Sequence, residues 1–301
     1  MNQKLTRPAH RTIQSTILLL ILPIGSGSAF AADVSIGTYV PMPVGANLAL
    51  LYLGGGEAKE YVPEHGSKID SGTQLKLRTG LIRLFHVLDV AGAPVQLQLG
   101  LPFGRQELKV NHRKIGSDSG LADPFVGITF WPVNNPEKKE YFGITGQVVL
   151  PLGSYDHDKS VNMGGNRYQG ILQAGYSRTV GAWQYDLVGD VTVYTDNDES
   201  GHYKSRLEQS PSYTLQPWIG YNFGDKNRTK ISVGLTKYFN GESQLDGVDT
   251  GRRTDSLRGR FGISTWLSPK FQVYTEVTRD IEVKGGYSFD YSGFIRLGYA
   301  F

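Results

Sequence analysis

The sequence ends in "DYSGFIRLGYAF" (residues 290–301), and this stretch decides the fold. From residue 289 onward, six large apolar side chains share one parity: Phe289, Tyr291, Ile295, Leu297, Tyr299 and Phe301. The other parity is mostly polar or small, with Asp290, Ser292, Arg296, Gly298 and Ala300. A period of two indicates a β-strand between two unlike environments, because successive side chains point to opposite faces. Those environments are either a protein core and water, or lipid and a polar lumen.

The N-terminus has the layout of a secretory signal peptide. Basic residues (Lys4, Arg7 and Arg11) precede the apolar run "TILLLILPIG" at residues 16–25, and Ala29 and Ala31 form a small-residue cleavage site. The run is shorter than the ~20 apolar residues that a membrane-spanning helix needs. We therefore expect a signal peptide over residues 1–31, cleaved near Ala31, and an exported protein.

Charge and cysteine content exclude several classes of function. The leader carries three of the 31 basic residues and none of the 28 acidic ones, so the remaining chain is formally neutral. This balance gives no reason to expect a nucleic-acid partner. The chain has no cysteine, which excludes disulfides and thiolate chemistry. No later segment is apolar enough for a transmembrane helix, leaving a soluble secreted protein or an outer-membrane barrel.

Alternation and turn residues predict an even number of strands after the leader. Twelve are expected, at residues 46–57, 73–87, 94–109, 122–133, 140–153, 167–180, 183–195, 212–223, 229–240, 254–267, 271–281 and 288–301. The connections alternate long and short, as in "VNHRKIGSDSG" followed by "NNPEKK". Long outer loops and short periplasmic turns are typical of outer-membrane barrels with both termini inside. The sequence therefore predicts an all-β, 12-stranded antiparallel transmembrane β-barrel in the outer membrane of a Gram-negative bacterium.

This fold assigns a role to the C-terminal pattern and divides the chain. Odd-numbered residues of the last strand should face lipid, and Tyr299 with Phe301 resembles the sorting signal that barrel-assembly machinery reads. Residues 32–45 form an N-terminal periplasmic or lumen segment, and residues 46–301 form the barrel. Twelve strands predict a narrow pore or a partly filled lumen, because barrel width grows with strand number.

Seven charged residues are candidates for the lumen and its selectivity. They are Arg258, Arg260, Arg296, Asp186, Asp190, Glu276 and Asp280. The strand with Glu276 and Asp280 lies between the two strands with arginines, so the acids can reach the arginines laterally. The charges either form compensating ion pairs that fix strand register or build a selectivity constriction.

Three prolines are candidates for bends in the barrel wall. Pro102, Pro124 and Pro151 fall on neighbouring predicted strands, and proline cannot donate to a strand ladder. One interpretation is that they bend the wall inward or open a lateral gap near the extracellular mouth. The other is that they serve curvature and assembly alone.

The sequence gives no catalytic residue, metal site or cofactor motif. After the leader there are five histidines, and four of them fall in different predicted outer loops. His157 lies between Asp156 and Asp158, but isolated loop histidines are usually solvated. No hydrolase, phosphate-loop or zinc-spacing motif is present. We therefore expect that the protein is not an enzyme.

Several motifs resemble those of a known family. Gly120, Asp123 and Pro124 form a G-x-x-D-P element in "GLADPFVGITFWP". Further elements are "PLGSYD" at residues 151–156 and "GGNRY" at residues 164–168. Together they resemble the meta-pathway phenol degradation (MetA) family of outer-membrane transporter-like proteins. The resemblance implies a barrel often found beside pathways for aromatic or hydrophobic compounds, and it supplies no catalytic residues.

These observations predict a channel that admits small hydrophobic or aromatic compounds by passive diffusion. Its expected partners are outer-membrane lipid, the solute and the barrel-assembly machinery. The alternative is a closed barrel that acts as a structural or surface-interaction protein through its extracellular loops.

Overall fold

The computed structural model of the protein describes residues 33–225, 228–250 and 253–301. The expected signal peptide and its cleavage site near Ala31 lie outside these residues. Within them, no helix is both long and apolar enough to cross a membrane.

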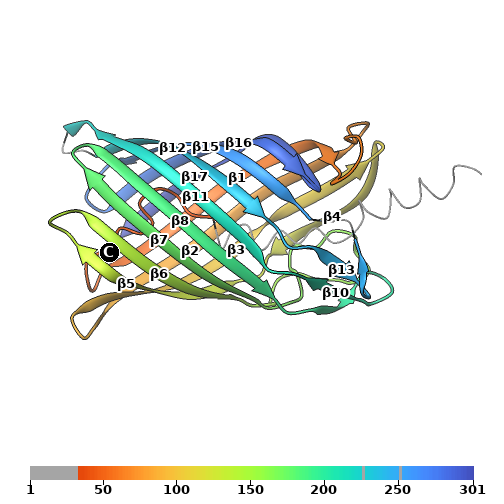
Figure 1. Ribbon diagram of the computed structural model, residues 1–301, viewed down its shortest axis with the longest axis horizontal. Helices are drawn as coiled ribbons and strands as arrows, with labels where there is room; N and C mark the ends of the chain where they lie inside the picture. The colour runs from red at the N-terminus through yellow and green to blue at the C-terminus, as the bar shows by residue number, and fades with distance from the viewer. Residues whose placement is uncertain (1–32, 226–227, 251–252) are drawn as a thin grey trace, which may run out of the picture.

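The described residues form a closed antiparallel barrel, which confirms the predicted fold (Figure 1). Within this part of the chain, twelve strands make the wall: β1 Asn47–Val62, β2 Gln74–Val90, β3 Ala93–Val110, β5 Phe125–Asn135, β6 Glu140–Val149, β7 Gln169–Val180, β8 Trp183–Tyr194, β11 Ser212–Phe223, β12 Thr229–Phe239, β15 Asp255–Trp266, β16 Phe271–Lys284 and β17 Gly286–Ala300. The barrel closes where β1 pairs with both β17 and β2, and β2 pairs with β3. Because no wall strand is left without two neighbours, the backbone groups are satisfied inside the bilayer.

Five further strands extend the extracellular end, where the sequence predicted loops. The strand β4 (Arg113–Leu121) pairs with the outer part of β3. A small separate sheet contains β9 Asn197–Ser200, β10 Ser205–Gln209, β13 Ser243–Leu245 and β14 Val248–Asp249. The β3–β4 hairpin turns through Asn111 and His112, which both have positive φ angles. A two-residue turn of this kind normally carries Asn-Gly, so the histidine concealed the hairpin in the sequence.

The outer surface of the barrel follows the predicted alternation. On β8, Tyr185 and Leu187 are exposed, whereas Gln184 and Asp186 between and beside them are buried toward the lumen. On β17, Tyr291, Ile295, Leu297 and Tyr299 are exposed as expected, and so is Phe301 directly after it.

Phe289 is the exception on β17, and its predicted lipid-facing position is wrong. The register between β1 and β17 shifts so that Glu57 pairs with Tyr291 but Ala58 pairs with Phe289. The extra residue, Asp290, forms a bulge, and a one-residue slip moves every following side chain to the other face. Phe289 therefore packs inside, against the cluster that contains Tyr61 and Leu75.

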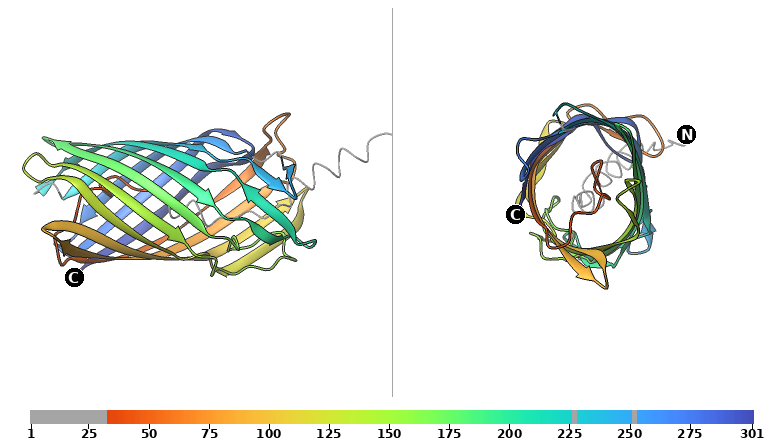
Figure 2. Two further views of the ribbon diagram at one scale, coloured as in Figure 1. Left: turned by 60° about the horizontal axis from the view of Figure 1, so that its bottom comes forward. Right: turned by 90° about the vertical axis from the view of Figure 1, so that its left-hand side faces the viewer.

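The chain before β1 lies inside the barrel. Residues 33–46, here called the N-terminal segment, run within the ring of strands in the view along its axis (Figure 2, right). Val34 and Tyr39 of this segment are buried and form a small apolar cluster with Val188 of β8. The segment then leaves the lumen at the periplasmic end, where Asn47 pairs with Phe301 through two backbone hydrogen bonds.

Candidate functional site

A cavity of about 470 Å³ occupies the extracellular half of the lumen. Its floor includes Asp33, Ser35 and Thr38 of the N-terminal segment. The strands β1, β2 and β17 supply an apolar wall, which contains Tyr52, Leu75, Leu77, Leu81, Phe289 and Phe294. Facing charge comes from β15 and β16, through Arg258, Arg260 and Glu276. The cavity therefore offers one apolar and one charged surface to the same solute.

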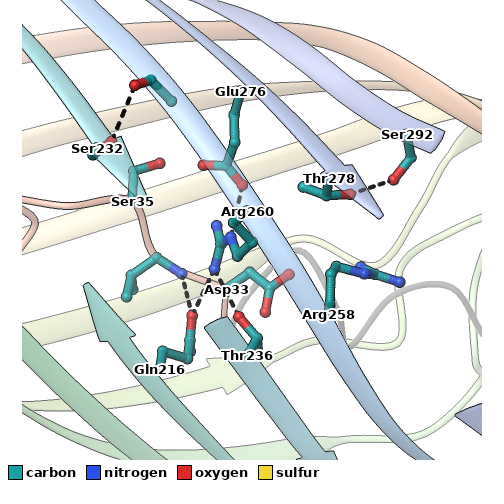
Figure 3. Close-up of polar contacts among 12 residues, drawn as sticks. Asp33, Ser35, Gln216, Ser232, Thr236, Arg258, Arg260, Glu276, Thr278 and Ser292 are labelled. Atoms are coloured by element: carbon teal, nitrogen blue, oxygen red, sulfur yellow. Dashed lines mark hydrogen bonds and ion pairs between the residues drawn. The ribbon is translucent and has the colours of Figure 1, made fainter. Parts of the chain in front are cut away.

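Two ion pairs on β15 and β16 hold most of this charge. Arg258 Nε lies 2.7 Å from Asp280 Oδ1. Figure 3 shows the second pair, in which Arg260 Nε lies 2.7 Å from Glu276 Oε1. Arg260 also donates through Nη1 to Gln216, at 3.0 Å, and to Thr236, at 3.1 Å.

These two pairs differ in exposure. The side chains of Arg260 and Glu276 are 3% and 1% exposed, whereas that of Arg258 is 22% exposed. The first pair is thus a buried part of the wall, and the second has a guanidinium open to the cavity.

Arg296, the third predicted arginine, lies apart from these pairs. It donates to Gln272 Oε1 at 3.0 Å, and no ion pair links it to a carboxylate of the described residues. Its guanidinium carbon lies 4.6 Å from the ring centre of Tyr274 and 5.7 Å from that of Tyr52. The predicted arginine cluster is therefore two paired residues and one that stacks on aromatic rings.

The acids of β8 contact the N-terminal segment and neighbouring polar residues. Asp186 accepts hydrogen bonds from the backbone amide of Gly37, at 2.6 Å, and from the Ser177 hydroxyl, at 2.7 Å. Asp190 accepts hydrogen bonds from Thr214 and Gln173. These acids therefore lie around the N-terminal segment in the lumen, away from the arginines of β15.

A tyrosine that the sequence did not single out fills the periplasmic half of the lumen. The Tyr39 hydroxyl lies 3.0 Å from both Thr145 Oγ1 and Gln173 Oε1, and the Trp131 indole donates to the Tyr39 carbonyl oxygen at 2.9 Å. The space left beside Tyr39 measures about 10 Å³, which is too small for an organic solute.

Two glycines make room for the Tyr39 ring. Gly143 on β6 and Gly175 on β7 pair directly across the ladder. A Cβ atom would lie 2.7 Å from the Tyr39 ring at Gly143 and 2.0 Å from it at Gly175. Paired glycines on the lumen face of neighbouring strands were thus the signal in the sequence for an inserted side chain.

The three prolines surround a gap in strand pairing. The strand β3 pairs with β5 up to Gly100 and with β4 from Phe103 onward, so its partner changes at Pro102. Pro124 lies just before β5, which begins three residues later than predicted. Pro151 lies just after β6, which ends four residues earlier than predicted. Proline's missing amide explains these shorter strands.

Residues 150–168, here called the wall segment, cover this gap without forming a strand. The Asp123 carboxylate accepts hydrogen bonds from the backbone amides of Gly153, at 2.9 Å, and Gly165, at 2.6 Å. Asp118 of β4 accepts a hydrogen bond from the amide of Met163, at 2.9 Å. Two carboxylates therefore attach the wall segment to the end of β4.

In the outer loops, Asp158 contacts two histidines, His157 and His202. Asp158 Oδ1 lies 2.6 Å from His202 Nδ1, and this contact holds the pKa of Asp158 below its ordinary value. Possible ligand atoms of Asp156, His157 and Asp158 lie within 4.8 Å of one another. These groups are solvated, and the expected absence of a metal site stays a prediction.

The proposed sorting residues lie on the outer surface at the periplasmic rim. The rings of Tyr299 and Phe301 are stacked with their centres 5.9 Å apart. Both side chains are exposed.

Solved structures that resemble the protein are outer-membrane barrels. An outer membrane channel from Pseudomonas putida F1 matches with a TM-score of 0.84 and 29% identity, over 89% of this chain and 100% of that chain. The transport unit of the autotransporter AIDA-I from Escherichia coli matches with a TM-score of 0.54 and 11% identity, over 96% of this chain and 97% of that chain. This second likeness shows the fold alone.

The sequence itself also has a family match. No curated protein matches it. The family described as "Putative MetA-pathway of phenol degradation" matches residues 58–297, which is most of the chain and includes β2 to β16 entirely. The protein therefore belongs to this family, as the motifs around Asp123, Pro151 and Asn166 predicted.

Proposed function

We propose that the protein is an outer-membrane channel that admits small hydrophobic or aromatic compounds by passive diffusion. The observation that carries the proposal is the cavity of about 470 Å³ with an apolar wall inside a barrel. A pore for hydrophilic solutes would have a polar lining throughout. The likeness to the Pseudomonas putida channel supports a channel role rather than a catalytic one.

The N-terminal segment narrows the lumen below the cavity. The pocket beside Tyr39 measures about 10 Å³, which is too small for an organic solute. Two routes onward are a displacement of the N-terminal segment and a sideways exit. We propose the second route, through the gap at Pro102, Pro124 and Pro151, because the wall segment closes that gap through isolated hydrogen bonds rather than a strand ladder.

Uptake by whole cells tests the channel itself. Cells that produce the protein should accumulate labelled toluene and toluate faster than cells with an empty vector, and arabinose at the same rate. Single-channel recordings in a planar bilayer, with and without phenol, toluate or a fatty acid, should show that these solutes block the residual current. Equal accumulation of all solutes with and without the protein would contradict the channel and favour a role for the extracellular loops.

A reversible disulfide tests the lateral route. A Cβ atom on Gly116 of β4 would lie 3.5 Å from Val161 Cβ of the wall segment, which suits a disulfide. Because the chain has no cysteine, the Gly116→Cys, Val161→Cys variant would form this bond alone. We expect oxidation to slow toluene uptake and dithiothreitol to restore it, with the Gly116→Cys single variant as control. Unchanged uptake in the oxidised double variant would mean that solutes pass the N-terminal segment instead.

A further inference from the structure

Arg83 of β2 is a buried charge with a partner set unlike that of the arginines on β15. Its side chain donates through Nε and Nη2 to Gln98 Oε1, at 3.0 Å for Nε. Its guanidinium carbon lies 4.9 Å from the ring centre of Phe85 and 5.5 Å from that of Phe125. Arg83 is only 6% exposed, yet within the described part of the chain no carboxylate forms an ion pair with it.

Such an arrangement leaves the positive charge of Arg83 incompletely compensated. Removing a guanidinium from water is costly, and the partners of Arg83, which are the Gln98 amide oxygen, the Tyr52 hydroxyl and two rings, carry no formal negative charge and offset only part of that cost. Arg296 adds a second guanidinium nearby without a carboxylate partner among the described residues. Ionisable groups inside membrane proteins commonly mark ligand pathways, where a passing charge completes the pairing.

The position of Arg83 makes it accessible to a solute in the cavity. It lines both the outer cavity and the small space beside Tyr39 below, so it lies at the boundary between them. Above it, the cavity face of the same strand carries Leu81, Leu77 and Leu75. Alternate residues of a strand are about 6.8 Å apart, so Leu81 is the apolar neighbour of Arg83 on this face. Thr79 separates Leu81 from Leu77 and Leu75, which form a second apolar patch farther out.

The carboxylates that line the cavity are already engaged. Asp33 accepts a hydrogen bond from the Tyr238 hydroxyl at 2.8 Å. Glu276 pairs with Arg260 and accepts a hydrogen bond from the Tyr274 hydroxyl. Neither carboxylate is bonded to Arg83, so the part of the cavity beside Leu81 and Arg83 is positively charged.

From this arrangement we infer that Arg83 binds the carboxylate of an amphipathic anion whose apolar part lies against Leu81 and the neighbouring Tyr52. A carboxylate can accept two parallel hydrogen bonds from a guanidinium, which a neutral hydroxyl cannot. A cationic head group would meet two arginines. The inference deepens the proposed function and rests on it, because it names the solutes that the channel prefers.

Three solutes with one tail and different head groups test this inference. Binding of octanoate, 1-octanol and octylamine to the protein in nanodiscs of zwitterionic lipid would be measured by calorimetry, with empty nanodiscs as blanks. We expect octanoate to bind about tenfold more tightly than the other two, the scale of a charge-assisted hydrogen bond. Arg83→Met should lower octanoate affinity by about tenfold and leave octanol affinity unchanged.

Arg78→Met is the matched control, because Arg78 lies on the same strand but is exposed on its other face. It should bind octanoate like the wild type. Equal affinity of the wild type for octanoate and octanol would overturn the anion site, and this comparison needs no variant that has to assemble. If cells still accumulated toluene, such a result would overturn the anion site but not the proposed channel function. Loss of toluene accumulation would count against the proposed function itself.

Discussion

The two halves of the lumen are built from the same strands but differ in content. In the periplasmic half, Gln and Thr side chains of neighbouring strands surround Tyr39, and the pocket between them measures about 10 Å³. In the extracellular half, apolar side chains face paired charges across about 470 Å³. Both halves share the alternation that separates lipid from lumen.

This contrast shows that the alternation determines which side chains face the lumen, but not how much of the lumen they fill. A lumen-facing position can hold a glycine, a glutamine or an arginine, and the space left depends on the sum across all strands. The filled half depends on a segment that is no part of the wall, and the hollow half depends on charges that neutralise one another. Both dependences can be broken separately by substitution.

The largest expected effect is in the hollow half, at the buried pair of Arg260 and Glu276. Arg260→Met leaves the Glu276 carboxylate buried, with the Tyr274 hydroxyl as its remaining donor among the contacts described. Removing one partner of a buried pair costs about 3–5 kcal/mol in the free energy of unfolding. Urea titration of the refolded protein in lipid, followed by the slower gel migration of the unfolded form, would measure this loss.

Two further variants distinguish charge from packing at this pair. Arg260→Met with Glu276→Met should recover most of the stability, because replacing both charges leaves none unpaired. Arg258→Met should cost less than Arg260→Met, since the Arg258 side chain is 22% exposed and already partly hydrated, and Asp280 keeps a hydrogen bond from the Phe289 backbone amide at 2.9 Å. Equal losses for all three variants would show that side-chain shape, rather than charge pairing, stabilises this wall.

The next effect is in the filled half, where Gly175→Val should expel the Tyr39 ring. A Cβ atom at Gly175 would lie 2.0 Å from that ring, and the paired backbone cannot move aside. We expect single-channel conductance to rise by roughly severalfold, since a 12-stranded barrel encloses space beyond its own side chains. Gly146→Ala on β6 is the control, because its Cβ would meet nothing within 4 Å. Unchanged conductance in Gly175→Val would mean that the N-terminal segment does not limit the current.

Features repeated along each strand could be predicted from the sequence, whereas single long-range contacts could not. The exposed Leu187 beside the buried Asp186 follows directly from a period of two. Phe289 does not, because the bulge at Asp290 is a property of the pairing between two strands. The hydroxyl contacts of Tyr39 join residues 106 and 134 positions apart, and no local pattern encodes them. No pattern in the sequence marks Arg83 as a site residue, because it is one charge within the leucine-rich "GLIRLF".

The smallest expected effect separates the hydrogen bonds of Tyr39 from its bulk. Tyr39→Phe keeps the ring between Gly143 and Gly175 but removes the hydroxyl that contacts Thr145 and Gln173. We expect a loss of about 1–2 kcal/mol in the free energy of unfolding and nearly unchanged conductance. The same urea titration and bilayer recordings would measure both quantities. A conductance increase as large as that of Gly175→Val would show that the hydroxyl, rather than the ring in its glycine slot, keeps the N-terminal segment in the lumen.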